Sequence, residues 1–421
     1  MGQDLDRRSF LKGSALGLAG AAIPGTAVAG HWPPPDPNRP PGHHELPGGG
    51  GGTDEGDIPQ PSELPGRPEP TVRTEHERGD VVVTRYQSNL EANDFGCWGD
   101  TRTGLIYVTQ RLTDRIAVFD RNREEFVDLL YIPTDGSGAH SIKVDEAANR
   151  VWFAMGEASK IGSLVLAEES LRPVNFVEYT VPGDVRSERK PHGLVVVDHA
   201  VWYTDDRQDR TGWLDKSTGR VHVIPEHIES DGIAVEDRRE SLSAYRRRRR
   251  RKRGPKGRQG PLRIWVGGGN QVTVIDARTH RILHRVTIAE EPGFAQLRVH
   301  DLHYHRESNR VYVLLRGADH VVWLDADRPH EGPQGFINPV EMAAGFDHTD
   351  LGERYLWWTE GRSNNIGRYD LRTGELTGFK VPVPFGYFNP HGIYAEPRWR
   401  EVWFTEREAL CRIRFKDGRQ I

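Results

Sequence analysis

The sequence predicts an all-β fold, a seven-bladed β-propeller, and three observations carry this prediction. A strand core of one aliphatic and one aromatic residue, followed by two more apolar or small residues, recurs at residues 106–109, 151–154, 201–204, 264–267, 311–314, 356–359 and 402–405. Successive aromatic residues of these cores are 45 to 50 residues apart in five intervals and 63 apart in the sixth, and the shorter spacing fits one four-stranded blade. The 46 glycines and the 9% of aromatic residues suit many short strands joined by tight turns.

A segment typical of a third strand follows each core. In five repeats this segment closes on an aspartate, at Asp120, Asp215, Asp276, Asp325 and Asp370. A turn and an alternating outer strand come next, as in residues 217–225. Strand and turn signals at this period predict a blade for every repeat.

The seventh repeat ends too soon to supply its own outer strand, because six residues remain after residue 415. The alternating segment 81–86 precedes the first repeat and has no blade of its own. We therefore expect this N-terminal segment to supply the missing strand and close the ring, which hides an open sheet edge. Cys97 and Cys411 then lie in neighbouring repeats, where either a disulfide or two buried thiols would fit.

The N-terminus has the pattern of a twin-arginine export signal. Residues 7–12 read Arg-Arg-Ser-Phe-Leu-Lys, and a weakly apolar stretch then ends in Ala27-Val28-Ala29, a small-x-small cleavage site. We expect residues 1–30 to be a signal peptide and the protein to be periplasmic, at the cell surface or extracellular. Residues 31–79, rich in Pro, Gly and charge, are expected to form a disordered linker. The propeller is expected over residues 80–421, with no transmembrane segment in the mature chain.

The charge balance argues against nucleic acid as a specific partner and against a membrane surface. The chain has 57 basic and 61 acidic residues, which gives a net charge of −4. A basic run at residues 246–253 lies within the long interval, and we expect residues 237–260 to form a solvated loop inserted in the fourth blade. Binding of a polyanion is the alternative role for this run. We expect a monomer that binds a small-molecule substrate or ligand at the mouth of its channel.

Histidines recur at one position of the repeat, at the start of the predicted innermost strand. They are His140, His192, His300, His348 and His391, while the fourth repeat has Asp231 there and the first reads Asp-Phe-Gly-Cys over residues 94–97. Equivalent inner-strand residues face one another around the channel of a propeller. We therefore expect these side chains to form a binding site at the channel mouth. For any one histidine, a structural hydrogen-bonding role is the alternative.

Acidic residues end the second strands of three repeats, at Asp205, Glu360 and Glu406. A carboxylate one strand away from a histidine can orient it or hold a hard cation such as Mg²⁺. We group Glu360 with the channel-mouth residues. The alternative, a strand-capping role, applies better to Glu360 than to Glu406.

The last repeats resemble those of the streptogramin B (virginiamycin B) lyases. Residues 390–393 read Pro-His-Gly-Ile and residues 402–406 read Val-Trp-Phe-Thr-Glu, as in that family. Residues 365–375 are similar to the family's Asn-x-Ile-Gly-Arg-x-Asp and Thr-Gly segments. The likeness extends over residues 80–421.

This resemblance implies a lyase that opens a cyclic ester by elimination. It implies His391 as the base that removes a proton from carbon, His348 as its partner, and Glu406 as a ligand of Mg²⁺. One departure is Asn389, where the family has a second acidic metal ligand and this chain has a neutral amide.

Three functions stay open on the sequence alone. The first is a metal-assisted lyase or esterase outside the cytoplasm, which requires His391, His348 and Glu406 to converge. The second is a propeller that binds a ligand, a glycan or a protein without catalysis, because fold does not guarantee chemistry. The third is a transition-metal site made of four or more of the repeated histidines at bonding distance.

Overall fold

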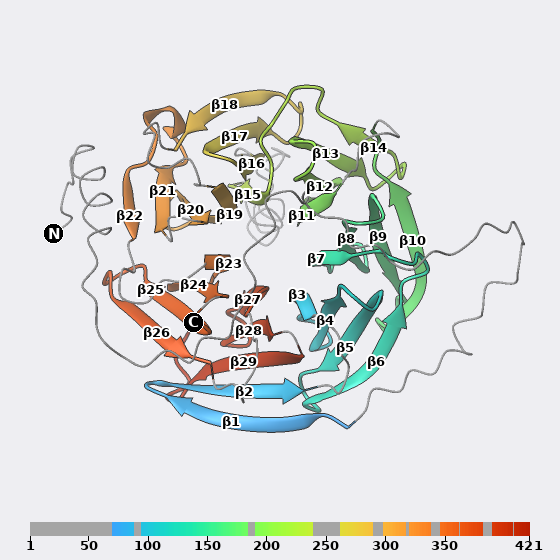
Figure 1. The fold of residues 1–421 in the computed structure, drawn as a ribbon, viewed down its shortest axis with the longest axis vertical. Coiled ribbons are helices and arrows are strands. Elements are labelled where there is room, and N and C mark those ends of the chain that lie inside the picture. The colour runs from blue at the N-terminus through green and yellow to red at the C-terminus, as the bar shows by residue number, and fades with distance from the viewer. Residues whose placement is uncertain are drawn as a thin grey trace, which may run out of the picture. The chain divides into compact units, whose positions relative to one another are not determined.

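The computed structural model describes residues 70–87, 94–183, 190–238, 262–288, 298–316, 320–337, 346–361, 363–381, 390–406 and 408–421. These residues form seven antiparallel sheets around a central channel, which is the predicted seven-bladed propeller (Figure 1). The predicted signal peptide, most of the predicted linker, the basic run and Asn389 lie outside the described residues. Within the described ranges, no helix is long and apolar enough to cross a membrane.

In six blades, four strands follow one another along the chain from the channel outward. Blade 1 consists of β3 (Asp94–Asp100), β4 (Leu105–Gln110), β5 (Arg115–Asp120) and β6 (Glu125–Tyr131). Blade 2 consists of β7 (Ala139–Asp145), β8 (Arg150–Met155), β9 (Lys160–Leu166) and β10 (Pro173–Thr180). Blade 3 consists of β11 (Pro191–Val196), β12 (Ala200–Asp205), β13 (Arg210–Asp215) and β14 (Val221–Val223). Blade 4 consists of β15 (Gly232–Asp237), β16 (Leu262–Gly268), β17 (Gln271–Asp276) and β18 (Ile282–Thr287). Blade 5 consists of β19 (Arg298–His305), β20 (Arg310–Arg316), β21 (His320–Asp325) and β22 (Gly335–Ile337), with a 3₁₀ turn η2 at Pro329–Glu331. Blade 6 consists of β23 (Phe346–Leu351), β24 (Tyr355–Glu360), β25 (Asn365–Asp370) and β26 (Leu376–Lys380).

Blade 7 combines both ends of the propeller. It contains β27 (Ile393–Glu396), β28 (Glu401–Glu406) and β29 (Ala409–Phe415), followed outward by β2 (Val81–Gln87) and β1 (Val72–Arg78). β2 pairs with β29 along its whole length, so the prediction that residues 81–86 close the ring is confirmed (Figure 1).

β1 corrects the expected start of the propeller at residue 80. This strand pairs antiparallel with β2 and gives blade 7 a fifth strand, so the predicted linker ends before Val72. The sequence signal is weak because β1 reads VRTEHER and none of its side chains is buried. A strand with no buried face shows no apolar alternation, and charged side chains on it protect the sheet edge from further pairing.

The hydrophobic core lies between neighbouring blades. The aromatic residues of the second strands supply its largest members, and Trp152, Trp202, Trp265, Trp357 and Trp403 are at most 1% exposed. One cluster joins Tyr86 and Trp403 of blade 7 to Ile106 and Phe119 of blade 1, across the closing interface. Cys97 and Cys411 are buried free thiols in two different clusters, which is one of the two alternatives that the sequence leaves open.

The aspartates that close the third strands have a local structural role. Each accepts a hydrogen bond from the backbone N–H two residues later, which fixes the turn into the outer strand. The five pairs are Asp120 with Asn122, Asp215 with Ser217, Asp276 with Arg278, Asp325 with Asp327, and Asp370 with Arg372.

Candidate functional site

The starts of the seven innermost strands bring one side chain each into the channel. We call this set the channel ring: Phe95, His140, His192, Asp231, His300, His348 and His391. The structure thus brings the five repeated histidines and Asp231 together, as their position in the repeat predicts. Phe95 is the seventh member, which the sequence did not single out.

Consecutive members of the channel ring contact one another all the way round. Ring centroids are 4.0 Å apart for Phe95 and His140, 4.0 Å for His140 and His192, 5.2 Å for His300 and His348, 4.3 Å for His348 and His391, and 3.5 Å for His391 and Phe95. Asp231 links the remaining two, with its Oδ1 3.1 Å from Nδ1 of His192 and its Oδ2 3.0 Å from Nδ1 of His300. The ring is therefore a closed layer of polar and aromatic side chains across the channel.

Threonines at the ends of second strands hold this layer in place. In blade 3 the Thr204 hydroxyl accepts a hydrogen bond from the backbone N–H of Gly193 at 2.8 Å and donates one to the carbonyl of Asp231 at 2.7 Å. The same hydroxyl-to-carbonyl bond joins Thr109 to His140, Thr359 to His391, and Thr405 to Phe95. Each threonine bridge ties one innermost strand to the ring residue of the next blade.

Glycine after the ring residue has a steric reason in two blades. A Cβ on Gly232 would lie 2.4 Å from the carbonyl oxygen of His300, and one on Gly392 would lie 2.4 Å from that of Phe95. Both distances are below any real contact, so a side chain would push the neighbouring innermost strands apart. In both blades the ring residue faces the channel, and the glycine after it lets the innermost strands of neighbouring blades lie close together.

Asp231 is the charged centre of one half of the ring. It is 3% exposed, and its Oδ2 also lies 2.7 Å from Nε of Arg298, two residues before His300. Burial alone would raise the pKa of the Asp231 carboxyl, but the charges and hydrogen bond of His300, with His192 and Arg298, lower it well below its usual range. Asp231 is therefore ionised across the physiological pH range.

The histidines on the other side of Asp231 resist protonation. Burial, followed by the neighbouring His192 and His391, lowers the pKa of His140 well below its usual value. Burial also lowers the pKa of His192, although Asp231 opposes this shift. Both imidazoles are therefore neutral at pH 7, the state in which a ring nitrogen can bind a metal or accept a proton.

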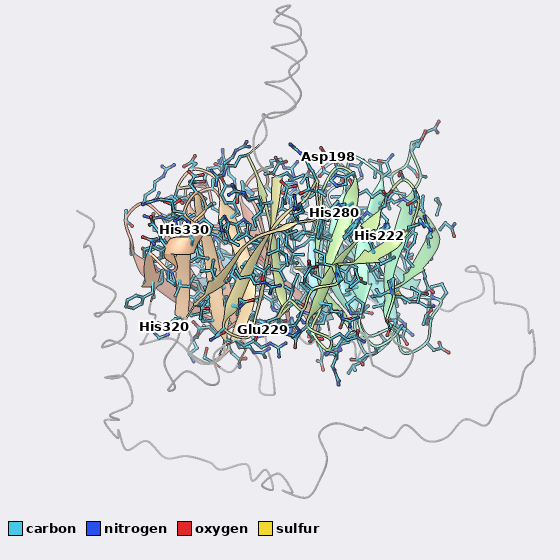
Figure 2. All side chains as sticks on the ribbon, turned by 90° about the horizontal axis from the view of Figure 1, so that it is seen from above. Asp198, His222, Glu229, His280, His320 and His330 are labelled. Carbon is cyan, nitrogen blue, oxygen red and sulfur yellow. The ribbon has the colours of Figure 1, made fainter. Side chains whose placement is uncertain are left out.

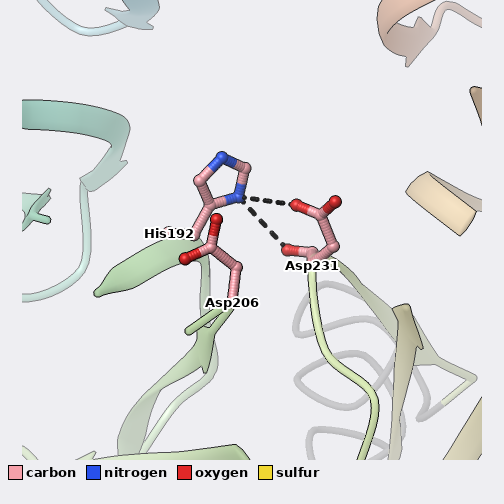
Figure 3. Close-up of side chains that lie close together, drawn as sticks. All are labelled: His192, Asp206 and Asp231. Atoms are coloured by element: carbon pink, nitrogen blue, oxygen red, sulfur yellow. Dashed lines mark hydrogen bonds and ion pairs between the residues drawn. The ribbon is translucent and has the colours of Figure 1, made fainter. Parts of the chain in front are cut away.

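One group in the ring has the donors of a metal site. His192, Asp206 and Asp231 each offer a ligand atom, and these three atoms lie within 4.8 Å of one another (Figure 3). Oδ1 of Asp206 is buried and accepts no hydrogen bond from the residues that the structure describes, and Oδ1 of Asp231 is buried with the 3.1 Å contact to Nδ1 of His192. Lys190 Nζ lies 3.8 Å from Oδ2 of Asp206. Asp206 directly follows Asp205, which ends β12. The repeat pattern pointed to Asp205 and not to Asp206.

The donor set of this group fits a divalent cation. Two carboxylates and one imidazole match Zn²⁺, Mn²⁺ or Fe²⁺ better than Mg²⁺, which prefers oxygen ligands. Metal–ligand bonds of about 2.0–2.2 Å require only a small inward movement of side chains whose ligand atoms already lie this close. Arg298 and His300 share the opposite oxygen of Asp231 and balance part of its charge.

Glu406 is not placed to hold a metal in the channel. Its carboxylate is fully buried, with Oε2 2.9 Å from Nε of Arg85 on β2 and Oε1 3.3 Å from Sγ of Cys411. Burial raises the pKa of Glu406, and the contacts with Arg85 oppose that shift. The expected Mg²⁺ ligand is instead half of an ion pair inside blade 7, because a guanidinium already satisfies it.

Glu360 also lies inside its own blade rather than at the channel mouth. Its carboxylate accepts hydrogen bonds from Nε1 of Trp358 at 3.0 Å, from Oγ of Ser363 at 2.6 Å and from Nδ2 of Asn365 at 3.0 Å. Asp205 is similar, since its Oδ1 accepts from the backbone N–H of Lys190 at 2.9 Å. These strand-ending acids stabilise turns, which corrects the placement of Glu360 in the binding site.

The lyase hypothesis requires His391, His348 and Glu406 to converge, and the structure brings the two histidines together without the glutamate. His348 and His391 are adjacent, partly exposed members of the channel ring, whereas Glu406 is paired with Arg85 inside blade 7. The transition-metal hypothesis also fits only in part. The histidines gather, but among the described residues the group whose ligand atoms converge is the one of His192, Asp206 and Asp231.

Comparison with known proteins places the fold but not the family. No protein-family model and no curated protein matches the sequence. Among solved structures, a streptogramin B lyase is 16% identical with a TM-score of 0.59, and the alignment covers 80% of this chain and 98% of that one. A chain from the mitotic checkpoint complex is 12% identical with a TM-score of 0.56, covering 86% and 96%. At these identities the likeness establishes the propeller fold alone.

Proposed function

We propose that this chain is a metal-dependent carbon–oxygen lyase that opens a cyclic ester by elimination at the channel ring. The observation that carries the proposal is the convergence of His192, Asp206 and Asp231 in the same ring as the adjacent pair His348 and His391. A divalent cation would be held by the first group, and the second pair would move the proton.

The chain's own residues have distinct tasks in this reaction. His391 accepts the proton from the carbon next to a carbonyl, and His348, at a centroid distance of 4.3 Å, keeps its ring in place. The electron pair of the broken C–H bond forms a C=C bond, while the ester C–O bond breaks and its oxygen leaves as a carboxylate. A bound cation supplies one effect, the withdrawal of electron density from the carbonyl oxygen, which acidifies the adjacent C–H. No water is consumed.

Metal binding tests the first part of this proposal. The purified protein is loaded with Mg²⁺, Mn²⁺ or Zn²⁺ in turn, dialysed and analysed for bound metal. We expect about one equivalent of Mn²⁺ or Zn²⁺, and a loss of affinity of at least about tenfold in Asp206→Asn, because one anionic ligand is lost. Asp209→Asn, in the same turn, is the matched control and should bind as the wild type does. Full binding by Asp206→Asn would show that the metal is not held by this group.

Turnover tests the second part. Cyclic depsipeptides are incubated with the metal-loaded protein and analysed by mass spectrometry, since elimination leaves the mass of the opened product unchanged and hydrolysis adds one water. We expect an opened product of unchanged mass, and a rate reduced by about 10²–10⁴-fold in His391→Ala. An opened product one water heavier, or no product with any metal, would contradict the lyase.

A propeller that binds a ligand without transforming it is the second candidate. The observation that favours it is Phe95, whose ring lies between His391 at 3.5 Å and His140 at 4.0 Å, so that aromatic contacts occupy part of the ring. Metal binding without turnover of any ester would support this candidate.

A further inference from the structure

A second layer of ionisable side chains lines the channel beyond the ring. A cavity of about 410 Å³ is bounded by ring residues and by Lys143 of β7, Asp301 and His303 of β19, and Asp350 of β23. These four residues have no part in the function proposed above. They come from blades 2, 5 and 6, so only the closed propeller assembles them.

Lys143 differs from every other lysine that the structure describes. Its Nζ lies 3.4 Å from the centroid of the Trp98 ring, and it has no hydrogen bond or ion pair with the described residues. The other described lysines each contact an oxygen: Lys160 that of Glu178, Lys190 that of Asp206, Lys216 that of Asp145, Lys380 that of Ser363 and Lys416 that of Glu77. The Lys143 amine thus lines the cavity against an aromatic ring, without a carboxylate at ion-pair distance among the described residues.

Burial makes the charged form of Lys143 less favourable than in an exposed lysine, although the face of the Trp98 ring attracts that form. Burial lowers the pKa of the amine, and the charges of Asp350 and Asp301 oppose this only in part. A larger fraction of this amine is therefore unprotonated at pH 7 than of an exposed lysine. A neutral amine has a free electron pair and is a nucleophile.

A proton-exchanging chain lies in the same layer. Nε2 of His303 is 3.5 Å from Oδ2 of Asp301, and its Nδ1 is 3.5 Å from Oδ1 of Asp350. Backbone N–H groups of Thr349 and Ala395 hold the two carboxylates in place, at 2.9 Å and 2.8 Å. Burial would lower the pKa of His303, but Asp301 and Asp350 raise it, and burial raises that of Asp350. Burial alone would also raise the pKa of Asp301, but the charge and hydrogen bond of His303 lower it well below its usual range, so this carboxylate is ionised. His303 and Asp350 are therefore the two groups of this layer that can exchange a proton.

The layer is reached from the end of the channel opposite the ring. A second cavity of about 620 Å³ shares Trp98, Val144 and Asp350 with the first, and it also touches Asp145, the last residue of β7, and Asp198, which follows β11. Figure 2 shows Asp198 at one face of the propeller and Glu229, two residues before Asp231, at the other. A ligand can therefore approach Lys143 without passing the ring.

The charge of this second mouth selects among ligands. Its lining combines six carboxylates with two basic side chains: Asp145, Glu146, Asp198, Asp237, Asp350 and Glu396, against Lys216 and Arg398. Such a mouth repels anions and admits neutral molecules. The cavity volume of about 410 Å³ limits the ligand to a small molecule.

We propose that Lys143 forms a reversible imine with a small uncharged aldehyde or ketone that enters from the mouth opposite the ring. The amine nitrogen bonds to the carbonyl carbon, and the carbonyl oxygen takes up a proton to give a carbinolamine. The nitrogen then loses a proton, and the oxygen takes up a second one. The C–O bond breaks to release water while the nitrogen lone pair forms the C=N bond, and loss of the remaining nitrogen proton gives the neutral imine. His303 and Asp350 are the donor and acceptor of these protons, and the ionised Asp301 carboxylate lies beside His303. The step needs no metal and no redox partner.

Reductive trapping tests the imine directly. The wild-type protein is incubated with propanal and cyanoborohydride, which reduces an imine to a stable secondary amine, and the labelled lysines are mapped by peptide mass spectrometry. We expect Lys143 to be labelled at least about tenfold faster than Lys160 or Lys216, which donate to carboxylates. Labelling of Lys143 at the same rate as these two, or more slowly, would overturn the proposal. This comparison within one protein does not depend on whether a variant folds.

Two further measurements separate this site from the metal site. Lys143→Arg should lose the fast phase of labelling, and Lys160→Arg, outside both cavities, should keep it. Removal of metal with a chelator, or Asp206→Asn, should leave the labelling of Lys143 unchanged, because the imine uses none of the metal ligands. A fast phase that persists in Lys143→Arg would contradict the assignment to this residue.

Discussion

At the residue scale, Glu406 shows how one distant partner decides what a carboxylate does. The motif around it suggests a metal ligand, yet Arg85, 321 residues away in the chain, lies 2.9 Å from it. Arg85 and Glu406 have side chains 5% and 0% exposed. Two charges buried together are stable only as a pair, because either one alone would be desolvated without compensation.

This pairing predicts the stability of variants at the closing blade. We expect Arg85→Met to lower the free energy of unfolding by about 3–5 kcal/mol, since it leaves the Glu406 carboxylate buried and unpaired. The double variant Arg85→Met with Glu406→Met should recover most of that loss, because the unpaired charge is then absent. Urea unfolding followed by fluorescence measures both values. Equal losses in the single and double variants would show that packing, and not charge, dominates at this site.

At the scale of the structural element, the innermost strands depend on the second strands of their own blades. The threonine bridges at Thr109, Thr204, Thr359 and Thr405 each join two innermost strands, and so position ring residues of blades 1, 2, 4 and 7. Blade 2 has Ala154 at the corresponding position, so the bridge is not required in every blade. The recurring strand core therefore has two functions: its aromatic residue fills the interface between blades, and its last residue fixes the ring.

The bridge in blade 3 provides a test of this role. Thr204→Val keeps the shape of the side chain but leaves the Gly193 N–H and the Asp231 carbonyl without the hydroxyl. We expect a loss of about 1–3 kcal/mol in the free energy of unfolding, measured in urea. We also expect metal affinity to weaken, because Asp231 is no longer held. An unchanged stability in Thr204→Val would mean that water replaces the bridge.

At the scale of the whole molecule, the propeller buries several histidines in their neutral form. Burial lowers the pKa of His140 and His192 in the ring and of His280 on the outer side of blade 4. His280 stacks on Trp213 at a centroid distance of 3.8 Å, and His222 stacks on the same ring at 4.8 Å. In the unfolded chain these imidazoles take up protons near their ordinary pKa of about 6.5.

Stability is therefore expected to fall as the pH falls from 7.5 to 5. Below about pH 6.5 the unfolded state binds more protons than the folded state. Each histidine that stays neutral in the folded state therefore lowers the free energy of unfolding by up to about 1.4 kcal/mol for each pH unit of acidification. His303 opposes this trend, because its raised pKa adds stability that is present below the ordinary pKa and lost as the pH rises. Urea unfolding across this pH range measures the slope. His140→Phe, which copies Phe95 of blade 1, should reduce the slope, and an unchanged slope would contradict the role of the ring.

Much of the fold follows from local signals. The recurring strand cores, the aspartates at Asp120 to Asp370 that fix turns, and the early end of the last repeat predicted seven blades and their closure. β1 escaped prediction because an exposed strand of charged residues has no apolar pattern. The position of the five histidines followed from the repeat, since equivalent residues of a symmetric ring meet at its axis.

The sequence by itself determined the seven-bladed propeller, its closure by residues 81–86 and the gathering of the repeated histidines around one channel. Only the tertiary structure decided which acids reach that channel. Asp206 joins His192 and Asp231, whereas Glu360 and Glu406 turn into their blades. The reason is physical: periodicity fixes which strand and which end a residue occupies, but it does not show which side chain satisfies a buried charge. The partner of Glu406, Arg85, comes from the other end of the chain, and spacing within the repeat carries no information about it.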